Sequence, residues 1–249
     1  MKIAISGKGG VGKTTIMALL ACRLSETREV LVIDADPSPH MAQTLGFENI
    51  ETIQPIADMK TMLIERSAKT EGSPFYNINP QINDLPERFM LSKGNLKLMV
   101  LGAIQTADKG CACPESTVLK RLLTKLLLSG SQVILLDMEA GVEHLGRGTI
   151  AGVDHLLIVV NPSRSSIRTA EKIQRLAKEA GIPKMSFVGN LVNDEDDAAF
   201  LKEHLPEAPI ANFPNAQEIR QAERSKASVQ ALFASYIPSI DLLAEKIGL

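Results

Sequence analysis

The stretch that most constrains the fold of this chain is Gly-Lys-Gly-Gly-Val-Gly-Lys-Thr-Thr at residues 7–15. An apolar run at 2–6 directly precedes it, and a pattern of helical spacing at 13–26 begins within it. Glycine lets a backbone curl until successive amide protons point inward, and the positive end of a following helix adds its field. The sequence therefore predicts a strand, a tight loop and a helix that together form an anion-binding hollow.

These residues also fit the pattern G-x-x-x-x-G-K-[S/T] of a phosphate-binding P-loop, in the strand-loop-helix context that the pattern requires. We expect Lys13 to contact the β- and γ-phosphates of a nucleotide, Thr14 to hold Mg²⁺ through its hydroxyl, and Thr15 to contact the α-phosphate. The loop residues expected to surround the phosphates are Gly9, Gly10, Val11 and Gly12. The alternative, a tight turn with incidental glycines, does not account for this context.

Short apolar runs alternate with helical patterns, which indicates an α/β fold with a doubly wound, mostly parallel sheet and helices on both faces. The runs are apolar almost throughout, as strands covered on both faces must be. The expected strands are 2–6, 30–34, 96–101, 133–137, 155–160, 185–192 and a shorter run at 210–213. The expected helices are 13–26, 115–129, 166–180, 195–204 and 238–247. Residues 50–95, with four prolines, are expected to form a helical excursion with loops inside a single domain of 1–249.

Composition excludes several classes of protein. The net charge of −2 supplies no field for nucleic acid or an acidic membrane, and we find no local basic patch in the sequence. The opening residues lack the apolar run of a signal peptide, and nowhere do about 18 apolar residues run uninterrupted. Three cysteines, an odd number, argue for reduced thiols rather than a disulfide framework. We therefore expect a cytoplasmic protein that binds neither nucleic acid nor membrane.

Acidic residues follow two of the expected strands. Asp36 comes just after the strand at 30–34, and Asp137 ends the strand at 133–137. The carboxyl ends of neighbouring strands are where a doubly wound sheet collects its ligand contacts. Aspartates at strand ends also serve as helix caps and turn formers. The P-loop in the same sequence is what favours a ligand-binding role for these two.

A second lysine, Lys8, lies inside the loop and is not needed to hold phosphate within one chain. Read alone, it is a solvated loop cation. The pattern K-G-G-x-G-K-T-T resembles the deviant Walker A motif of a family of P-loop ATPases in the SIMIBI class, which includes septum-site and plasmid-partition ATPases and the nitrogenase iron protein. The resemblance implies that Lys8 reaches across a homodimer and neutralises charge at the partner's nucleotide. It also implies that Asp36 positions the attacking water and that Asp137 reaches Mg²⁺ through water.

Adenine is the base that this resemblance implies. In the family, an asparagine amide at the place of Asn190 reads adenine, and the loop at Phe213-Pro214-Asn215 covers the base. A guanine-binding protein would be expected to offer N-K-x-D, whereas Leu-Val-Asn follows Asn190 here. The implied nucleotide is therefore ATP. A turn-forming asparagine is the alternative interpretation of Asn190.

Two cysteines one residue apart, Cys111 and Cys113, need a separate explanation. A disulfide between them would be strained, and thiolates are soft ligands suited to Zn²⁺, Ni²⁺ or Cu⁺. A closed site requires four such ligands, whereas the remaining Cys22 lies in an expected helix and is expected to be buried. Two sulfurs therefore make half a site, which a two-fold dimer would complete. Two reduced surface cysteines are the alternative.

Across nearly the whole chain the sequence resembles the CooC family of nickel-insertion ATPases for carbon monoxide dehydrogenase, and a relative that matures acetyl-CoA synthase. The matching features are GKGGVGKTT, DADP, PIADMK (55–60), INP (78–80), the C-A-C pair, DMEAGVEHLGRGT (137–149) and the NP pair (161–162). The resemblance implies an ATP- and metal-promoted homodimer in which Cys111 and Cys113 of both subunits bind one Ni²⁺ or Zn²⁺. It also implies that ATP hydrolysis drives the delivery of nickel to the dehydrogenase or the synthase. Glu139 departs from the pattern of this family, and its carboxylate is expected to lie beside Mg²⁺. His144 is either a further nickel ligand or a solvent-facing or capping histidine.

Two alternatives use the same fold. One is a positioning or partition switch whose ATP-bound dimer binds DNA or a membrane. Membrane-binding members typically end in a basic amphipathic helix, whereas residues 238–249 carry two acids and one lysine. The other alternative is electron transfer through a shared iron-sulfur cluster, for which the cysteines of the nitrogenase iron protein lie far apart in the sequence.

Overall fold

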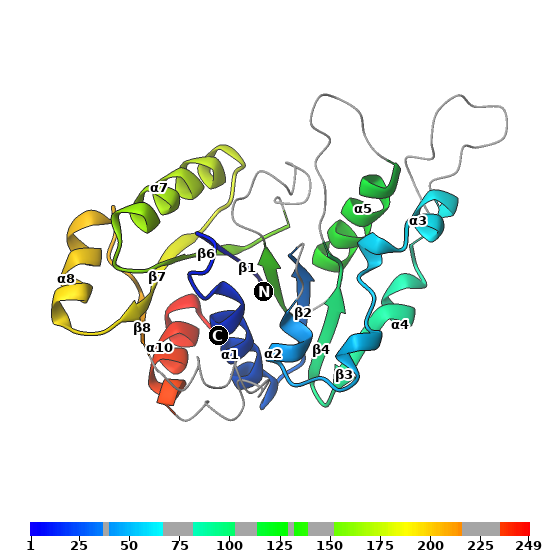
Figure 1. Cartoon of the computed structure of the whole chain (residues 1–249), viewed down its shortest axis with the longest axis horizontal. Coiled ribbons are helices and arrows are strands. Elements are labelled where there is room, and N and C mark those ends of the chain that lie inside the picture. The colour runs from blue at the N-terminus through cyan, green and yellow to red at the C-terminus, as the bar shows by residue number, and fades with distance from the viewer. Residues whose placement is uncertain (37–39, 67–81, 103–113, 129–131, 139–151, 216–234) are drawn as a thin grey trace.

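A computed structural model of the chain describes residues 1–36, 40–66, 82–102, 114–128, 132–138, 152–215 and 235–249. Its centre is an eight-stranded sheet in the order β3-β4-β2-β5-β1-β6-β7-β8 (Figure 1). The strands are β1 (Lys2–Gly7), β2 (Val30–Ala35), β3 (Met90–Lys93), β4 (Leu96–Val100), β5 (Val133–Met138), β6 (His155–Val160), β7 (Met185–Val192) and β8 (Ala211–Pro214). The helices are α1 (Lys13–Ser25), α2 (Met41–Thr44), η1 (Ile50–Thr52), η2 (Ile56–Asp58), α3 (Lys60–Arg66), α4 (Leu85–Phe89), α5 (Pro114–Leu128), α7 (Arg164–Glu179), α8 (Glu195–His204) and α10 (Ile237–Ile247).

The described strands run parallel except at one edge, where β3 is antiparallel to β4. From β1 the chain passes to β2 and β4 on one side and returns to β5 beside β1. It then continues through β6, β7 and β8 on the other side. The direction of winding therefore reverses beside β1, which is where doubly wound sheets bind their ligands. The predicted doubly wound α/β fold is confirmed.

Both faces of the sheet are covered, which explains why the strands read as continuous apolar runs. Side chains alternate across a sheet, so in β2 Leu31 and Ile33 join one core while Val30 and Val32 join the other. Helices α3, α5, α7 and α8 cover the first core, and α1, α2 and α10 cover the second (Figure 1). Because both covered faces of the sheet are apolar, a polar ligand can bind only at the ends of the strands.

The hairpin of β3 and β4 corrects the prediction for residues 50–95, which expected helices and loops alone. Short helices occupy much of the described part, but Met90–Lys93 forms a strand that pairs with Leu96–Val100. Gly94 and Asn95 make the two-residue turn, and Gly94 has a φ of 60°, a left-handed value that favours glycine. The overlooked signal was this Gly-Asn pair between two apolar runs.

The last helix packs on its own sheet, as its composition predicted. Ile240 and Ile247 of α10 are buried in the second core, and Arg23 of α1 contacts Asp241 at 2.7 Å. Cys22 lies in the same core, where burial raises the pKa of its thiol to about 11. Cys22 is therefore the small apolar residue that the sequence predicted, because a thiol with so high a pKa stays protonated at neutral pH.

Candidate nucleotide-binding site

The glycine-rich loop lies at the carboxyl end of β1 and leads into α1 (Figure 1). Two of its glycines have no room for a side chain. A Cβ atom on Gly7 would lie 2.5 Å from the carbonyl oxygen of Val159. One on Gly12 would lie 2.2 Å from Nδ2 of Asn190, and Gly12 also has a φ of 92°. The loop therefore needs glycine at these positions because of its packing as well as its conformation.

The first turn of α1 is arranged to receive an anion. Gly12 is the N-cap residue and no side chain caps the helix, so the amides at this end are left for an external acceptor. Lys13, the first helical residue, is only 8% exposed. Within the part of the chain that the structure describes, Lys13 forms no ion pair. A lysine buried to this degree requires an anionic partner, which a polyphosphate would supply.

Thr14 and Asp137 form the centre of the candidate Mg²⁺ site. The Thr14 hydroxyl donates to Oδ2 of Asp137 at 2.6 Å and so joins α1 to the end of β5. Asp137 is 1% exposed, and its Oδ1 has no hydrogen-bond partner among the described residues. Burial raises the pKa of Asp137 to about 7; the Thr14 hydrogen bond opposes this rise and the nearby Asp34 adds to it. An unpartnered carboxylate oxygen beside a hydroxyl is a hard-oxygen donor set, so these residues fit Mg²⁺.

Asp34 is a residue of this site that the sequence analysis missed. It lies beside Asp137 in the register of β2 and β5 and is also 1% exposed. Its carboxylate accepts hydrogen bonds from the backbone amides of Asp36 at 3.2 Å and Met41 at 3.1 Å. Burial raises the pKa of Asp34 to about 6, and the two amide hydrogen bonds oppose this rise. Asp34 therefore holds the backbone that carries Asp36 and ties it to the start of α2.

Lys8 contacts a different element within its own chain. It is exposed, and its Nζ donates to Oγ of Ser165 at 2.8 Å. Ser165 lies in the first turn of α7, directly after the neighbouring strand β6. A hydrogen bond of this kind contributes only about 1 kcal/mol, so Lys8 can leave Ser165 at small cost. The predicted role of Lys8 toward a second subunit stays a prediction.

Asn190 forms a hydrogen bond with the backbone of the phosphate loop. Its Nδ2 donates to the carbonyl oxygen of Val11 at 2.7 Å, and the residue is 8% exposed. Phe213 is 1% exposed and stacks on Tyr236, so its side chain belongs to the core, while the neighbouring Pro214 is exposed. The structure thus brings Asn190 to the phosphate loop. Contacts of Asn190, Phe213 and Pro214 with adenine stay predictions.

The predicted ligands of the transported metal lie outside the described residues. These are Cys111 and Cys113, together with Glu139 and His144 of the following segment. Among the residues that the structure does describe, no group of three or more His, Cys, Asp or Glu is placed to hold a metal ion. Binding of Ni²⁺ or Zn²⁺ therefore stays a prediction.

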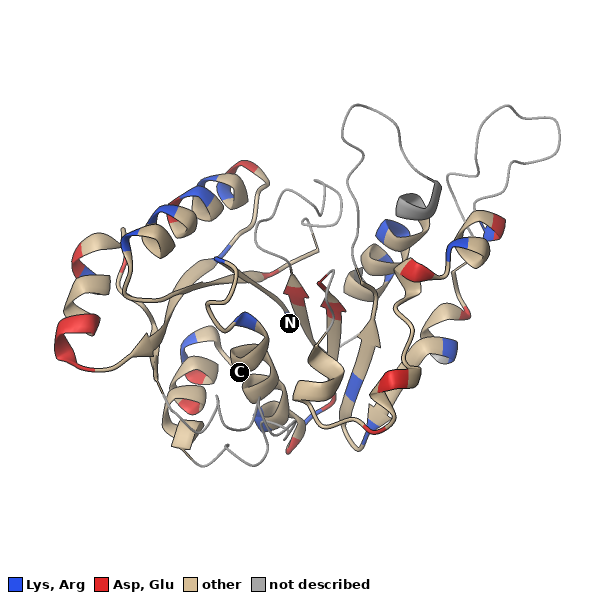
Figure 2. Ribbon diagram, viewed as in Figure 1, with Lys and Arg blue, Asp and Glu red and all other residues tan. Residues whose placement is uncertain are grey.

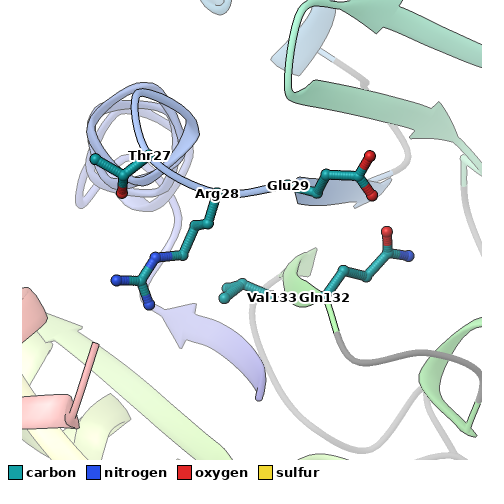
Figure 3. A pocket seen from close by; sticks show the side chains of 5 residues that line it. All are labelled: Thr27, Arg28, Glu29, Gln132 and Val133. Carbon is teal, nitrogen blue, oxygen red and sulfur yellow. The ribbon is translucent and has the colours of Figure 1, made fainter.

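A hollow of about 530 Å³ opens at the other end of the sheet. Its lining residues are Thr27, Arg28, Glu29, Gln132 and Val133. They lie just before β2, or at and just before the start of β5, whereas the phosphate loop follows the end of β1, which is parallel to β5. Figure 3 shows the Arg28 side chain on one side, with Glu29 and Gln132 on the other. The hollow is therefore separate from the nucleotide site, and its charges do not converge on a common ligand.

Comparison with known proteins agrees with this geometry. Residues 2–230 match the family described as the CobQ/CobB/MinD/ParA nucleotide binding domain. The chain belongs to this family. The carbon monoxide dehydrogenase accessory protein CooC of Rhodospirillum rubrum is 37% identical over 92% of this chain and 89% of that protein. An uncharacterized ATP-binding protein of Methanocaldococcus jannaschii is 39% identical over 90% of this chain and 88% of its own length.

Solved structures of this family show the same fold. The septum site-determining protein MinD of Pyrococcus horikoshii, in complex with Mg-ADP, matches with a TM-score of 0.70 at 23% identity, covering 99% of this chain and 95% of that one. A putative plasmid partition protein of Borrelia burgdorferi bound to AMPPNP matches with a TM-score of 0.69 at 15% identity, covering 98% of each chain. The predicted CooC-type resemblance, the P-loop fold and the assignment as an ATPase are thereby confirmed.

Replacing Gly12 by alanine is expected to destabilise the protein by about 3 kcal/mol, since it adds left-handed strain and displaces a buried hydrogen bond. The new Cβ atom would collide with the Asn190 amide, whose Val11 hydrogen bond holds it in place. Urea unfolding measures the loss, and calorimetric titration with ATP is expected to show weakened binding. Gly181→Ala is the matched control, because Gly181 has a φ of 82° but nothing within 4 Å of a Cβ atom. Equal losses in the two variants would contradict the collision.

Proposed function

We propose that the protein is an ATP-hydrolysing metallochaperone. Two copies of the chain form a homodimer when they bind ATP, and Cys111 and Cys113 of both subunits then bind one Ni²⁺ or Zn²⁺. The dimer delivers nickel to carbon monoxide dehydrogenase or acetyl-CoA synthase. The observation that carries this proposal is the 37% identity to a carbon monoxide dehydrogenase accessory protein over 92% of the chain. The hydrogen bond between Thr14 and Asp137, beside the buried Lys13, supports the hydrolytic part.

The residues of the loop would bind and orient the triphosphate. The amides at the start of α1 and the Lys13 ammonium would face the phosphate oxygens, where charge develops during phosphoryl transfer. Mg²⁺, held by Thr14 and Asp137, would supply further positive charge to the phosphates. The Asp36 carboxylate would orient the attacking water, since Asp34 holds the Asp36 backbone beside the same strand ends.

A second subunit would complete both the hydrolytic site and the metal site. In the proposed dimer Lys8 leaves Ser165 and adds its charge to the partner's nucleotide. The two cysteine pairs then meet and provide four thiolates, the number that a closed tetrahedral site requires. Loss of the γ-phosphate removes contacts that favour this arrangement, so the affinities for the partner and for the metal fall together.

Replacing Cys111 and Cys113 by serine is expected to abolish the binding of one metal per dimer and to leave ATP affinity unchanged. A hydroxyl is a hard and weakly acidic ligand that cannot replace a thiolate for Ni²⁺ or Zn²⁺. Metal content per chain is measured by mass spectrometry after gel filtration, with and without a nonhydrolysable ATP analogue. Cys22→Ala is the control, because it removes a thiol that lies in the core. An unchanged stoichiometry in the double serine variant would refute the shared site.

Delivery is tested with a nickel-free client. Purified apo carbon monoxide dehydrogenase is mixed with nickel-loaded protein, and CO oxidation is followed with ATP, with the nonhydrolysable analogue, or without nucleotide. We expect activation only with hydrolysable ATP and intact cysteines. Activation at the same rate by free Ni²⁺ alone would contradict the proposed delivery, and a parallel assay with apo acetyl-CoA synthase identifies the preferred client.

A positioning or partition switch is the second candidate, favoured by the fold similarity to septum-site and plasmid-partition proteins. One observation counts against a membrane-bound form of it, because helix α10 buries its apolar side in its own core. None of the described helices is both long and apolar enough to span a bilayer. DNA binding is tested by gel retardation at two salt concentrations with ATP present, because contacts with phosphate give a steep dependence on salt.

A further inference from the structure

Helix α7 carries a row of exposed positive charges, which we call the α7 basic face. The residues that define this face are Arg164, Arg168, Lys172, Arg175 and Lys178. Its opposite side is buried in the first core through Ile167, Ala170, Ile173 and Ala177. Figure 2 shows the basic residues as successive blue bands along the helix. The helix is thus anchored by apolar side chains and presents cations to solvent.

Helical spacing gathers these charges on one side. Arg164, Arg168 and Arg175 fall within about 40° of one another around the helix axis and extend over about 17 Å along it. The sequence predicts no local basic patch, and for α7 that prediction is wrong. The cations are separated along the sequence by polar, apolar and acidic residues, and only the helix brings them together.

The charges of the α7 basic face are not all neutralised within the chain. Among the residues that the structure describes, no ion pair involves Arg168 or Arg175. Arg164 is positioned by a different contact, since its guanidinium lies over the ring of Phe200 in α8, 5.6 Å from the ring centre. Exposed cations without a partner carboxylate are available to an external anion.

The surrounding charges distinguish between kinds of anionic partner. Glu171 and Glu179 are exposed on the same side of α7, interspersed with the cations. The adjacent helix α8 begins with an acidic turn that contains Glu195 and Asp196, and the whole chain has a net charge of −2. A uniform polyanion such as duplex DNA would be repelled by these carboxylates, whereas a folded protein can match a patterned surface.

We infer that the α7 basic face docks an acidic surface of a folded partner protein. This inference rests on the proposed function for the identity of that partner, which is the enzyme that receives nickel. The position of α7 suits this role, because Ser165 in its first turn accepts the hydrogen bond from Lys8 of the phosphate loop. A partner on α7 therefore contacts a helix that begins beside the nucleotide site.

The double variant Arg168→Glu, Arg175→Glu tests the surface. Both side chains are exposed and neither belongs to the phosphate loop, so folding, ATP hydrolysis and metal content are expected to remain at wild-type levels. Affinity for apo carbon monoxide dehydrogenase, measured by surface plasmon resonance at low salt, is expected to fall roughly tenfold or more because two attractive contacts become repulsive. The variant Arg168→Lys, Arg175→Lys keeps the charge and is expected to retain most of the affinity.

A matched control separates a local surface from net charge. Lys60→Glu, Lys246→Glu makes the same change in charge at exposed positions of α3 and α10 and is expected to bind the client normally. Equal losses in both glutamate variants, or no loss in either, would overturn the docking surface. Retention of duplex DNA by wild type, lost on reversal of Arg168 and Arg175, would also overturn it in favour of nucleic acid.

The same experiment distinguishes failure of this surface from failure of the proposed function. If wild type neither binds nor activates the client, both proposals fall. If wild type binds and activates it and reversal of Arg168 and Arg175 has no effect, only the α7 surface falls.

Discussion

Replacing Lys8 by alanine is expected to lower kcat for ATP hydrolysis by roughly three orders of magnitude, as removal of an arginine finger does. ATP affinity is expected to remain close to wild type, because Lys13 and the amides of α1 provide the binding charge within the chain. In the structure Lys8 is exposed, and its ammonium group donates a hydrogen bond to Ser165. Steady-state hydrolysis and equilibrium binding of a fluorescent ATP analogue measure the two quantities separately.

Complementation decides whether Lys8 acts across a dimer. A Lys8→Ala subunit retains its own Asp137, so a partner carrying Asp137→Asn could supply the missing lysine to it. If Lys8 acts in trans, random pairing of equal amounts of the two variants restores about a quarter of wild-type activity, because one site in each mixed dimer is complete. If Lys8 acts within its own chain, no site in the mixture is complete and activity stays at background. Sedimentation velocity with ATP, on each variant and on the mixture, verifies that dimers form.

Replacing Asp137 by asparagine is expected to lower Mg²⁺-dependent kcat by roughly two to three orders of magnitude. Asp137 is the buried carboxylate whose Oδ1 has no hydrogen-bond partner among the described residues and whose Oδ2 accepts the Thr14 hydroxyl. Asparagine keeps the shape but removes the negative charge that binds a divalent cation. Hydrolysis is measured as a function of Mg²⁺ concentration. A kcat within threefold of wild type at saturating Mg²⁺ would show that Asp137 does not belong to the ion site.

The same substitution is expected to change how stability depends on pH in the absence of nucleotide. The pKa of Asp137 in the folded protein, about 7, is raised above its ordinary value of 3.8, because burial disfavours the charged form. The contribution of Asp137 to the free energy of unfolding is therefore fully present below the pKa of this residue in the unfolded chain. It is lost as the pH rises through the folded-state pKa of about 7. A tenfold difference between the acid dissociation constants of the folded and unfolded states corresponds to about 1.4 kcal/mol. Urea unfolding at pH 5.5 and pH 8.5 is expected to show a smaller loss of stability for Asp137→Asn than for wild type.

Wild type is the internal reference for this comparison, since Asp34, whose pKa is raised to about 6, is retained in both proteins. The difference between their pH profiles therefore reports mainly on Asp137. Parallel profiles would mean that Asp137 is not a buried, charge-disfavoured carboxylate in the nucleotide-free protein. Addition of Mg²⁺ and ATP analogue is expected to recover stability for wild type at pH 8.5, because a bound cation favours the ionised carboxylate.

Much of this molecule was predictable because its signals are local in the sequence. The strand, glycine loop and helix of residues 2–26 follow from hydrophobic spacing and from the backbone freedom of glycine. Thr14 was recognised from the P-loop pattern, and Asp137 from its place at the end of a predicted strand. The edge hairpin was predictable in principle from Gly94 and Asn95, but four prolines in the same segment favoured loops. Residues within one turn or one strand of each other determine such features, so no fold is needed to infer them.

Features that depend on residues distant along the chain became visible only in the folded protein. Asp34 became a site residue only because β2 lies beside β5, which buries two carboxylates together and leaves one to hold the Asp36 backbone. Asn190 meets the phosphate loop 179 residues away because β7 ends next to it in space. Residue types and their spacing were enough to predict the chemistry of the loop and the class of the fold. Only packing determined which polar groups share a low-dielectric environment, because burial and proximity, rather than residue type, set their hydrogen bonds and pKa values.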